Sequence, residues 1–135
     1  RIGYVAAIET LKKMKKIRSW EKILKNANYL EKKWIQLSNK HDLKLKIAGF
    51  KAITSFEFGK NNHKYKTYIT HEMLKQRYLA TNLIFINIHH TKDVVDKYIK
   101  KLDKIFSKIK KFENGLNVDK YLEGPACKPG FKRSN

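Results

Sequence analysis

Cysteine and arginine are both scarce in this sequence of 135 residues. The single cysteine, Cys127, excludes an intrachain disulfide framework and any zinc site built from several thiolates. Apolar runs fall well short of the roughly 20 residues that a membrane-spanning helix needs. Glycine-rich patterns that hold phosphates, G-x-G-x-x-G and Walker A, are missing. We therefore expect no membrane partner and no phosphate-binding loop within these residues.

Acidic residues are also few, and the resulting charge of +19 raises the question of a polyanionic partner. Only four of the 31 cations are arginine, the residue that base edges and phosphates favour. The lysines are spread around the expected helices, as on the solvated faces of amphipathic helices. A nucleic-acid partner is thus disfavoured, and a basic nucleic-acid-binding module is kept as an alternative.

The sequence begins at Arg1 and shows no secretory signal pattern. Together with the single cysteine, this fits a reducing compartment, and we expect a cytoplasmic protein. Residues 1–7 already resemble the entrance to a helix, so we also expect the chain to be a piece of a longer protein. The 41% of apolar residues is enough for one folded domain.

Helical periodicity dominates both ends of the expected domain. An apolar stripe predicts a first helix to about Ile17, and a second follows to about Lys40, with Ser19 as its N-cap. Thr91 is the expected N-cap of the last helix, which has the cleanest periodicity and runs to about Phe112. The first stripe contains Tyr4, Ala7, Ile8, Leu11 and Met14.

Period-two patterns predict strands between these helices. Leu43–Ile47 alternates apolar residues with lysines, and Ala52–Phe58 places Thr54, Phe56 and Phe58 on one face. A third helix is expected over Tyr65–Arg77, and two short extended pieces follow at 78–80 and 83–88. This order predicts an α+β fold, a small mainly antiparallel sheet covered by helices.

The expected domain covers residues 1–112, with residues 1–17 as the helix that enters it. Residues 113–135 lose the periodicity and contain both prolines, which predicts an irregular C-terminal tail. Among the five histidines, no spacing matches a metal motif, and Cys127 has no triad partners evident in the sequence. Composition and spacing alone therefore indicate a basic α+β domain and no catalytic residue.

Three stretches in order carry a family resemblance. The first is Arg1–Met14 (RIGYVAAIETLKKM), and the last is Leu122–Arg133 (LEGPACKPGFKR). Between them lie the His71–Leu74, Tyr78–Ala80 and His90–Thr91 segments. Together they resemble the C-terminal part of class III pyridoxal-phosphate (PLP)-dependent aminotransferases, particularly the branch similar to glutamate-1-semialdehyde 2,1-aminomutase.

The resemblance implies the small domain of a fold-type-I PLP-dependent transferase, which contributes a lid and part of the substrate wall to a homodimeric enzyme. In that family the Schiff-base lysine, the aspartate on the pyridinium nitrogen and the phosphate cup precede the matched segment. PLP is therefore expected in the full-length enzyme and not in this fragment alone, which we expect to lack catalytic competence. The expected partners are the upstream large domain and a small-molecule amino donor and acceptor.

One departure from the family concerns the substrate. Aminomutases carry a longer loop with a glutamate after the Leu-Ala pair, whereas this chain has residues 81–85 (TNLIF). The shorter form is more similar to aminotransferases of surface-polysaccharide biosynthesis, and the amino acceptor stays open. Thr81 and Asn82 are the expected substrate-binding residues, since hydroxyl and amide groups bind polar substrates. A plain turn between strands is the equal alternative for this pair.

Two alternatives concern the remaining residues and the whole chain. Lys132 and Arg133 could bind a carboxylate, although exposed surface positions are the usual place for such residues. A stand-alone interaction domain would have a closed core and no large exposed apolar surface. A fragment of a larger enzyme would instead expose apolar residues on the helix that carries Tyr4 or on the sheet.

Overall fold

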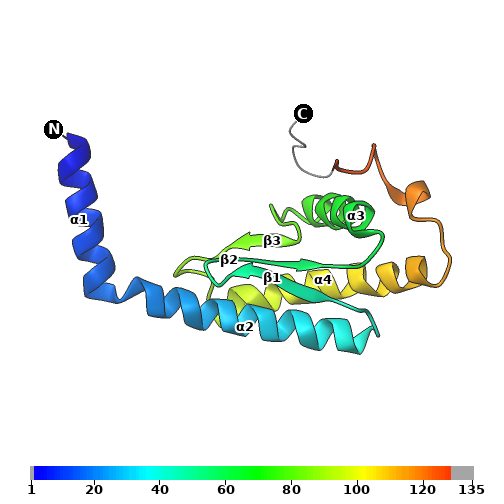
Figure 1. Ribbon diagram of the computed structural model, residues 1–135, viewed down its shortest axis with the longest axis horizontal. Helices are drawn as coiled ribbons and strands as arrows, with labels where there is room; N and C mark the ends of the chain where they lie inside the picture. The colour runs from blue at the N-terminus through cyan, green and yellow to red at the C-terminus, as the bar shows by residue number, and fades with distance from the viewer. Residues whose placement is uncertain (1, 129–135) are drawn as a thin grey trace, which may run out of the picture.

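A computed structural model describes residues 2–128 of the chain. Within these residues, four α-helices and three strands make up an α+β fold, which confirms the expected class (Figure 1). None of the helices in the described range combines the length and apolarity that a membrane crossing needs. The elements in chain order are α1 (Ile2–Ile17), α2 (Ser19–Lys40), β1 (Lys46–Phe50), β2 (Ile53–Glu57), α3 (Asn62–Lys75), β3 (Leu83–Phe85), α4 (Lys92–Glu113) and the 3₁₀ helix η1 (Val118–Tyr121).

The sheet is an antiparallel meander in the order β1-β2-β3. Phe50 lies opposite Ile53, which in turn lies opposite Phe85. Directly opposed residues share one face of a sheet, and successive residues alternate between faces. One face therefore carries Phe50, Ile53 and Phe85, and the other carries Thr54 and Phe56.

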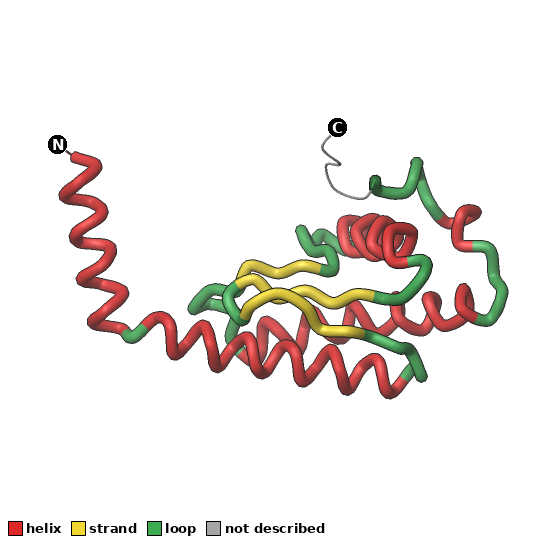
Figure 2. The backbone as a smooth tube through the Cα atoms, viewed as in Figure 1, coloured by secondary structure: helices red, strands yellow, loops and turns green. Residues whose placement is uncertain are grey.

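The second face is covered by helices and forms the core. Figure 2 shows α2 and α4 running together along the sheet. Phe56 is fully buried, and its ring meets Trp34 of α2 at 4.8 Å and Phe106 of α4 at 5.6 Å between centroids. Nε1 of Trp34 donates to the Tyr98 hydroxyl at 3.2 Å, so the buried indole N–H is satisfied. The predicted strand face and the apolar faces of α2 and α4 thus meet in one core.

Helix α1 projects away from the other elements (Figure 1), and none of its residues is buried. It ends at Ile17 as predicted, and Arg18 then adopts a left-handed conformation, with φ 49° and ψ 53°, before α2 begins. The apolar stripe of α1 faces solvent, with Tyr4 81% and Leu11 65% exposed. A single residue therefore turns the chain between two helices, and α1 projects from the rest of the domain.

The helix starts differ in detail from the sequence-based predictions. The N-cap of α2 is Arg18 rather than Ser19, because the left-handed turn places Ser19 inside the helix. The Ser19 hydroxyl is buried and has no hydrogen-bond partner among the described residues. Thr91 is the N-cap of α4 as predicted, although its side chain makes no capping hydrogen bond.

The middle of the chain also differs from the predicted boundaries. The first strand begins at Lys46 rather than Leu43, although Leu43 is buried as its apolar pattern indicated. Helix α3 spans Asn62–Lys75 instead of Tyr65–Arg77, because Arg77 takes a positive φ of 64° that a helix cannot continue. The predicted extended pieces shrink to β3, since residues 78–80 pair with no strand in the described part of the chain.

Candidate functional site

Thr81 and Asn82 lie where the chain enters β3, between α3 and the sheet. Asn82 is only 7% exposed, and its Nδ2 donates to the Phe56 carbonyl at 2.9 Å. The Phe56 N–H donates in return to the Asn82 carbonyl at 3.0 Å. If the β2-β3 ladder continued by one more pair, the Asn82 backbone N–H would donate to the Phe56 carbonyl. The Asn82 side-chain amide makes this hydrogen bond instead.

Thr81 connects the same corner to helix α3. Its hydroxyl accepts from the Thr70 hydroxyl at 3.0 Å and donates to Oδ1 of Asn82 at 3.3 Å. Thr81 is half-buried, so its hydroxyl lies at the surface of a hydrogen-bonded corner rather than on a free loop. These contacts show what orients both side chains, while their role in substrate binding stays a prediction.

A cleft of about 360 Å³ lies beside this corner. Its walls come from the segment before Thr81, from β3 and from the start of α4, with Leu30 of α2 also contributing. Ala80 and Leu83, on either side of the Thr81-Asn82 pair, both line it, and the polar residues in the lining include Asn87 and His90. Burial beside these apolar walls, together with the neighbouring His89, lowers the pKa of His90.

The lining of this cleft lacks the groups that PLP needs. The cofactor requires a lysine for its Schiff base and an acidic partner for its ring nitrogen. The cleft is lined by neither lysine nor carboxylate, so the residues present do not fit PLP there. Among residues 2–128, no three His, Cys, Asp or Glu side chains are grouped as metal ligands either.

Two apolar surfaces remain uncovered by residues 2–128. One is the stripe of α1, from Tyr4 to Met14. The other is the outer face of the sheet, where Phe50 is 66% and Phe85 65% exposed. Large exposed apolar surfaces of this kind mark sites of interaction with another polypeptide or another domain. For a fragment of a larger enzyme, such a surface is expected on the helix that carries Tyr4 or on the sheet, and the structure exposes apolar residues on both.

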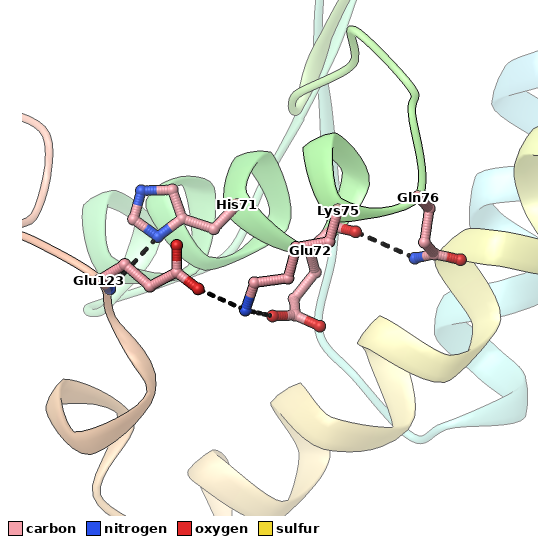
Figure 3. A network of polar contacts seen from close by, with 5 residues as sticks. All are labelled: His71, Glu72, Lys75, Gln76 and Glu123. Carbon is pink, nitrogen blue, oxygen red and sulfur yellow. Dashed lines mark hydrogen bonds and ion pairs between the residues drawn. The ribbon is translucent and has the colours of Figure 1, made fainter.

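The C-terminal segment is fastened to α3 by a polar network (Figure 3). Nζ of Lys75 contacts Glu123 at 2.6 Å and Glu72 at 2.8 Å, and the Glu123 N–H donates to Nδ1 of His71 at 3.4 Å. Hydrogen bonding to Lys75 lowers the pKa of Glu123, and the two carboxylates raise the pKa of Lys75. The segment predicted as an irregular tail therefore docks on the domain and includes η1.

Cys127 is also part of this docking. Its N–H donates to the Thr67 hydroxyl at 2.8 Å, and its Sγ lies 3.9 Å from Nδ1 of His63. No third member of a catalytic triad accompanies the pair among the contacts of the described residues. Lys132 and Arg133, the other candidate carboxylate-binding residues, lie outside the described residues.

Comparisons with known proteins extend these observations. No family model matches the chain, and a search of curated proteins finds no match. The fold is similar to that of the FumI protein of Sphingopyxis sp. MTA144, whose structure was solved in its PLP internal aldimine form. The TM-score is 0.70 at 22% sequence identity, and the match covers 84% of this chain.

This chain spans only 28% of the length of the FumI chain. At this identity the likeness shows the fold and not the activity. The described domain thus has the fold of one part of a PLP-dependent protein, as the sequence resemblance implied for a small domain.

Proposed function

We propose that this chain is the C-terminal small domain of a class III PLP-dependent aminotransferase of the glutamate-1-semialdehyde aminomutase-like type. In this proposal it forms a lid and part of the substrate wall of a homodimeric enzyme. The observation that carries the proposal is the fold shared with part of the PLP-dependent FumI chain. The order of the three family-like segments in the sequence supports the class.

The uncovered apolar surfaces support a place in a larger protein. A stand-alone domain would bury the stripe of α1 or lack it, but Tyr4, Val5, Ile8 and Leu11 are all exposed. Covering a large apolar side chain contributes about 1.5–3 kcal/mol of transfer free energy. The upstream large domain is the partner that we propose for this stripe and for the outer face of the sheet.

The chemistry of the lining supports a division of labour between the two domains. PLP supplies an electron sink for reactions at an amino-bearing carbon, and it needs a lysine and an acid in one site. Since the cleft beside β3 offers neither, we propose that the upstream domain holds the cofactor and that this chain alone does not transfer amino groups. This domain would then close over the site and exclude water.

Thr81 and Asn82 are the proposed contribution of this chain to substrate binding. Asn82 is held by Phe56 and Thr81 by Thr70, so both are preorganised by the fold. The half-buried Thr81 hydroxyl is the group that a polar amino donor or acceptor would meet. The absence of a carboxylate in residues 81–85 leaves the proposal without a preference for glutamate semialdehyde.

A comparison of the chain with its upstream-extended form tests this function. Both proteins are incubated with PLP, treated with borohydride and digested, and a pyridoxyl-modified lysine is sought by mass spectrometry. We expect the modified lysine only in the extended form, upstream of Arg1, together with amino-group transfer and a dimeric sedimentation coefficient. An extended form that never binds PLP would contradict the assignment.

A nucleic-acid-binding role is tested with the same preparations. A basic module would bind duplex DNA with an affinity that falls steeply as salt rises, because each phosphate contact releases counterions. The dispersed lysines predict weak binding without sequence preference. Tight DNA binding combined with no PLP binding in the extended form would replace the enzyme proposal with this alternative.

A further inference from the structure

Strand β3 is an edge strand, and part of its backbone has no partner among the described residues. Asn82 and Ile86 bond to β2 through a carbonyl and an N–H respectively. In an antiparallel ladder such residues alternate, so Ile84 between them also bonds to β2. The N–H and C=O groups of Leu83 and Phe85 therefore point away from β2, toward the open edge.

The apolar cleft lies along this same edge. Leu83 and Phe85 form one side of it, and Val94 and Val95 at the start of α4 form another. Val94 is 46% exposed, so the cleft is open to a partner that arrives from outside. An apolar groove beside free N–H and C=O groups is chemically complementary to an extended polypeptide, which offers both backbone bonds and alternating side chains.

The charge around the edge favours an acidic partner. On α4, Asp93 adjoins Val94, and Asp96 is paired with Lys33. Arg77 precedes the wall formed by residues 78–80, and Lys92 and Lys97 lie two residues before and three residues after Val94. All three are exposed, and in the described part of the chain none of them forms an ion pair with Asp or Glu. A chain of charge +19 attracts a segment that carries carboxylates.

We propose that the β3 edge binds an extended, acidic polypeptide segment by strand addition. Its backbone would bond to Leu83 and Phe85, and every second side chain would enter the cleft beside Val94. The carboxylates would be attracted by Arg77, the exposed cation next to the wall formed by residues 78–80. This surface is separate from the α1 stripe, although Phe85 also belongs to the outer face of the sheet.

Hydrogen exchange at single amides tests the proposal. The probe is a short synthetic peptide that alternates valine and threonine and carries glutamate at both ends. In the free chain, the Leu83 and Phe85 amides should exchange rapidly, while the Ile84 and Ile86 amides are protected. With the peptide, Leu83 and Phe85 should exchange at least about tenfold more slowly, because strand addition gives them partners.

Two controls separate strand addition from unspecific attraction. The same peptide with N-methylated amides keeps its charge and side chains and should give no protection. In the chain, Val94→Asp should raise the dissociation constant at least about tenfold. Ile35→Asp is the matched variant, since Ile35 is equally exposed at 46% but lies on α2 outside this cleft, and it should bind the peptide normally.

Other outcomes would overturn the proposal. If the N-methylated peptide also slowed exchange of the Leu83 and Phe85 amides, charge and apolar contact would explain the protection, and strand addition would be excluded. If Val94→Asp and Ile35→Asp raised the dissociation constant of the peptide equally, the peptide would not bind in this cleft. Protection of Leu83 and Phe85 that rises with chain concentration in the absence of peptide would assign the edge to a second copy. Circular dichroism of both variants verifies that each is folded.

Discussion

Asn82 and Phe56 exchange two hydrogen bonds across the end of the sheet, one through the Asn82 side chain and one through its carbonyl. Phe56 is at the centre of the core, so the polar corner and the aromatic cluster are held together by one pair. Any contribution of Thr81 and Asn82 to substrate binding is thereby superimposed on a structural role. Mutations at the two positions are expected to separate these roles.

Asn82→Ala is predicted to destabilise the domain by about 1–2 kcal/mol, because it leaves the buried Phe56 carbonyl without its partner. Urea denaturation followed by tryptophan fluorescence measures the change. Asn26→Ala is the control, since the Asn26 amide also bonds to a carbonyl, that of Asn87, but at an exposed site. It should change stability by less than about 0.5 kcal/mol. Equal effects of both substitutions would contradict the structural role of Asn82.

Gly49→Ala is predicted to destabilise the domain by about 1–3 kcal/mol, as backbone strain of this kind does. Gly49 has a φ of 87°, and an added Cβ would clash with the Ile53 carbonyl oxygen. Gly59→Ala is the matched control because a Cβ there meets nothing within 4 Å. Thermal unfolding of the two variants tests the difference. A melting temperature for Gly49→Ala as high as that of Gly59→Ala would show that the β1-β2 corner relaxes freely.

Leu11→Asp is predicted to change the free energy of unfolding of this chain by less than about 0.5 kcal/mol. The reason is that Leu11 is largely exposed, on a helix that buries none of its residues. Leu102→Ala in the core should instead lose about 2–5 kcal/mol. Chemical denaturation measures both variants. In the upstream-extended protein, Leu11→Asp should become destabilising if the large domain covers the α1 stripe, and no change there would leave that surface without the proposed partner.

The docking of Glu123 on Lys75 is predicted to depend on pH. The pKa of Glu123 is lower in the folded chain than in the unfolded one, so the pair stabilises docking above the ordinary pKa of glutamate. That contribution is lost as the pH falls through the lowered value. A carboxyl NMR titration should give Glu123 a midpoint below 4.5, the ordinary value, and Lys75→Met should raise it.

Lys64→Met is the control for this titration, because Lys64 pairs with Asp119 of the same C-terminal segment and not with Glu123. It should leave the Glu123 midpoint unchanged. A Glu123 midpoint at its ordinary value in the unmodified chain would mean that the ion pair does not persist in solution.

Helix periodicity predicted α2 and α4 well because each has one wide apolar face that the sheet covers. The buried positions Ala27, Leu30 and Trp34 in α2, and Val95, Tyr98 and Leu102 in α4, follow the expected spacing. The alternation of Thr54, Phe56 and Phe58 likewise predicted the covered face of β2, because each strand residue faces opposite to the next. These features depend on local patterns and on burial alone.

Other features depend on contacts that a local pattern does not contain. Serine is a residue type that favours N-cap positions, yet the left-handed conformation of Arg18 makes Arg18, and not Ser19, the N-cap of α2. Asn82 resembles a turn residue, although its amide replaces a backbone bond to Phe56, which lies 26 positions earlier. The outer edge of β3 becomes visible only when the strand order is known. Pairing across the chain therefore decides both the candidate site and the free edge.

The isolation of α1 has an energetic consequence for any complex that this domain forms. Most helical stability in proteins comes from packing of an apolar face and not from intrinsic helix propensity, and α1, with 16 residues, buries none of them. Burial of its apolar stripe by a partner would supply the missing stabilisation, so helix formation and association would be coupled. Such coupling should enlarge the heat-capacity change of association beyond that of two rigid surfaces, and it should lower the affinity gained per unit of buried area.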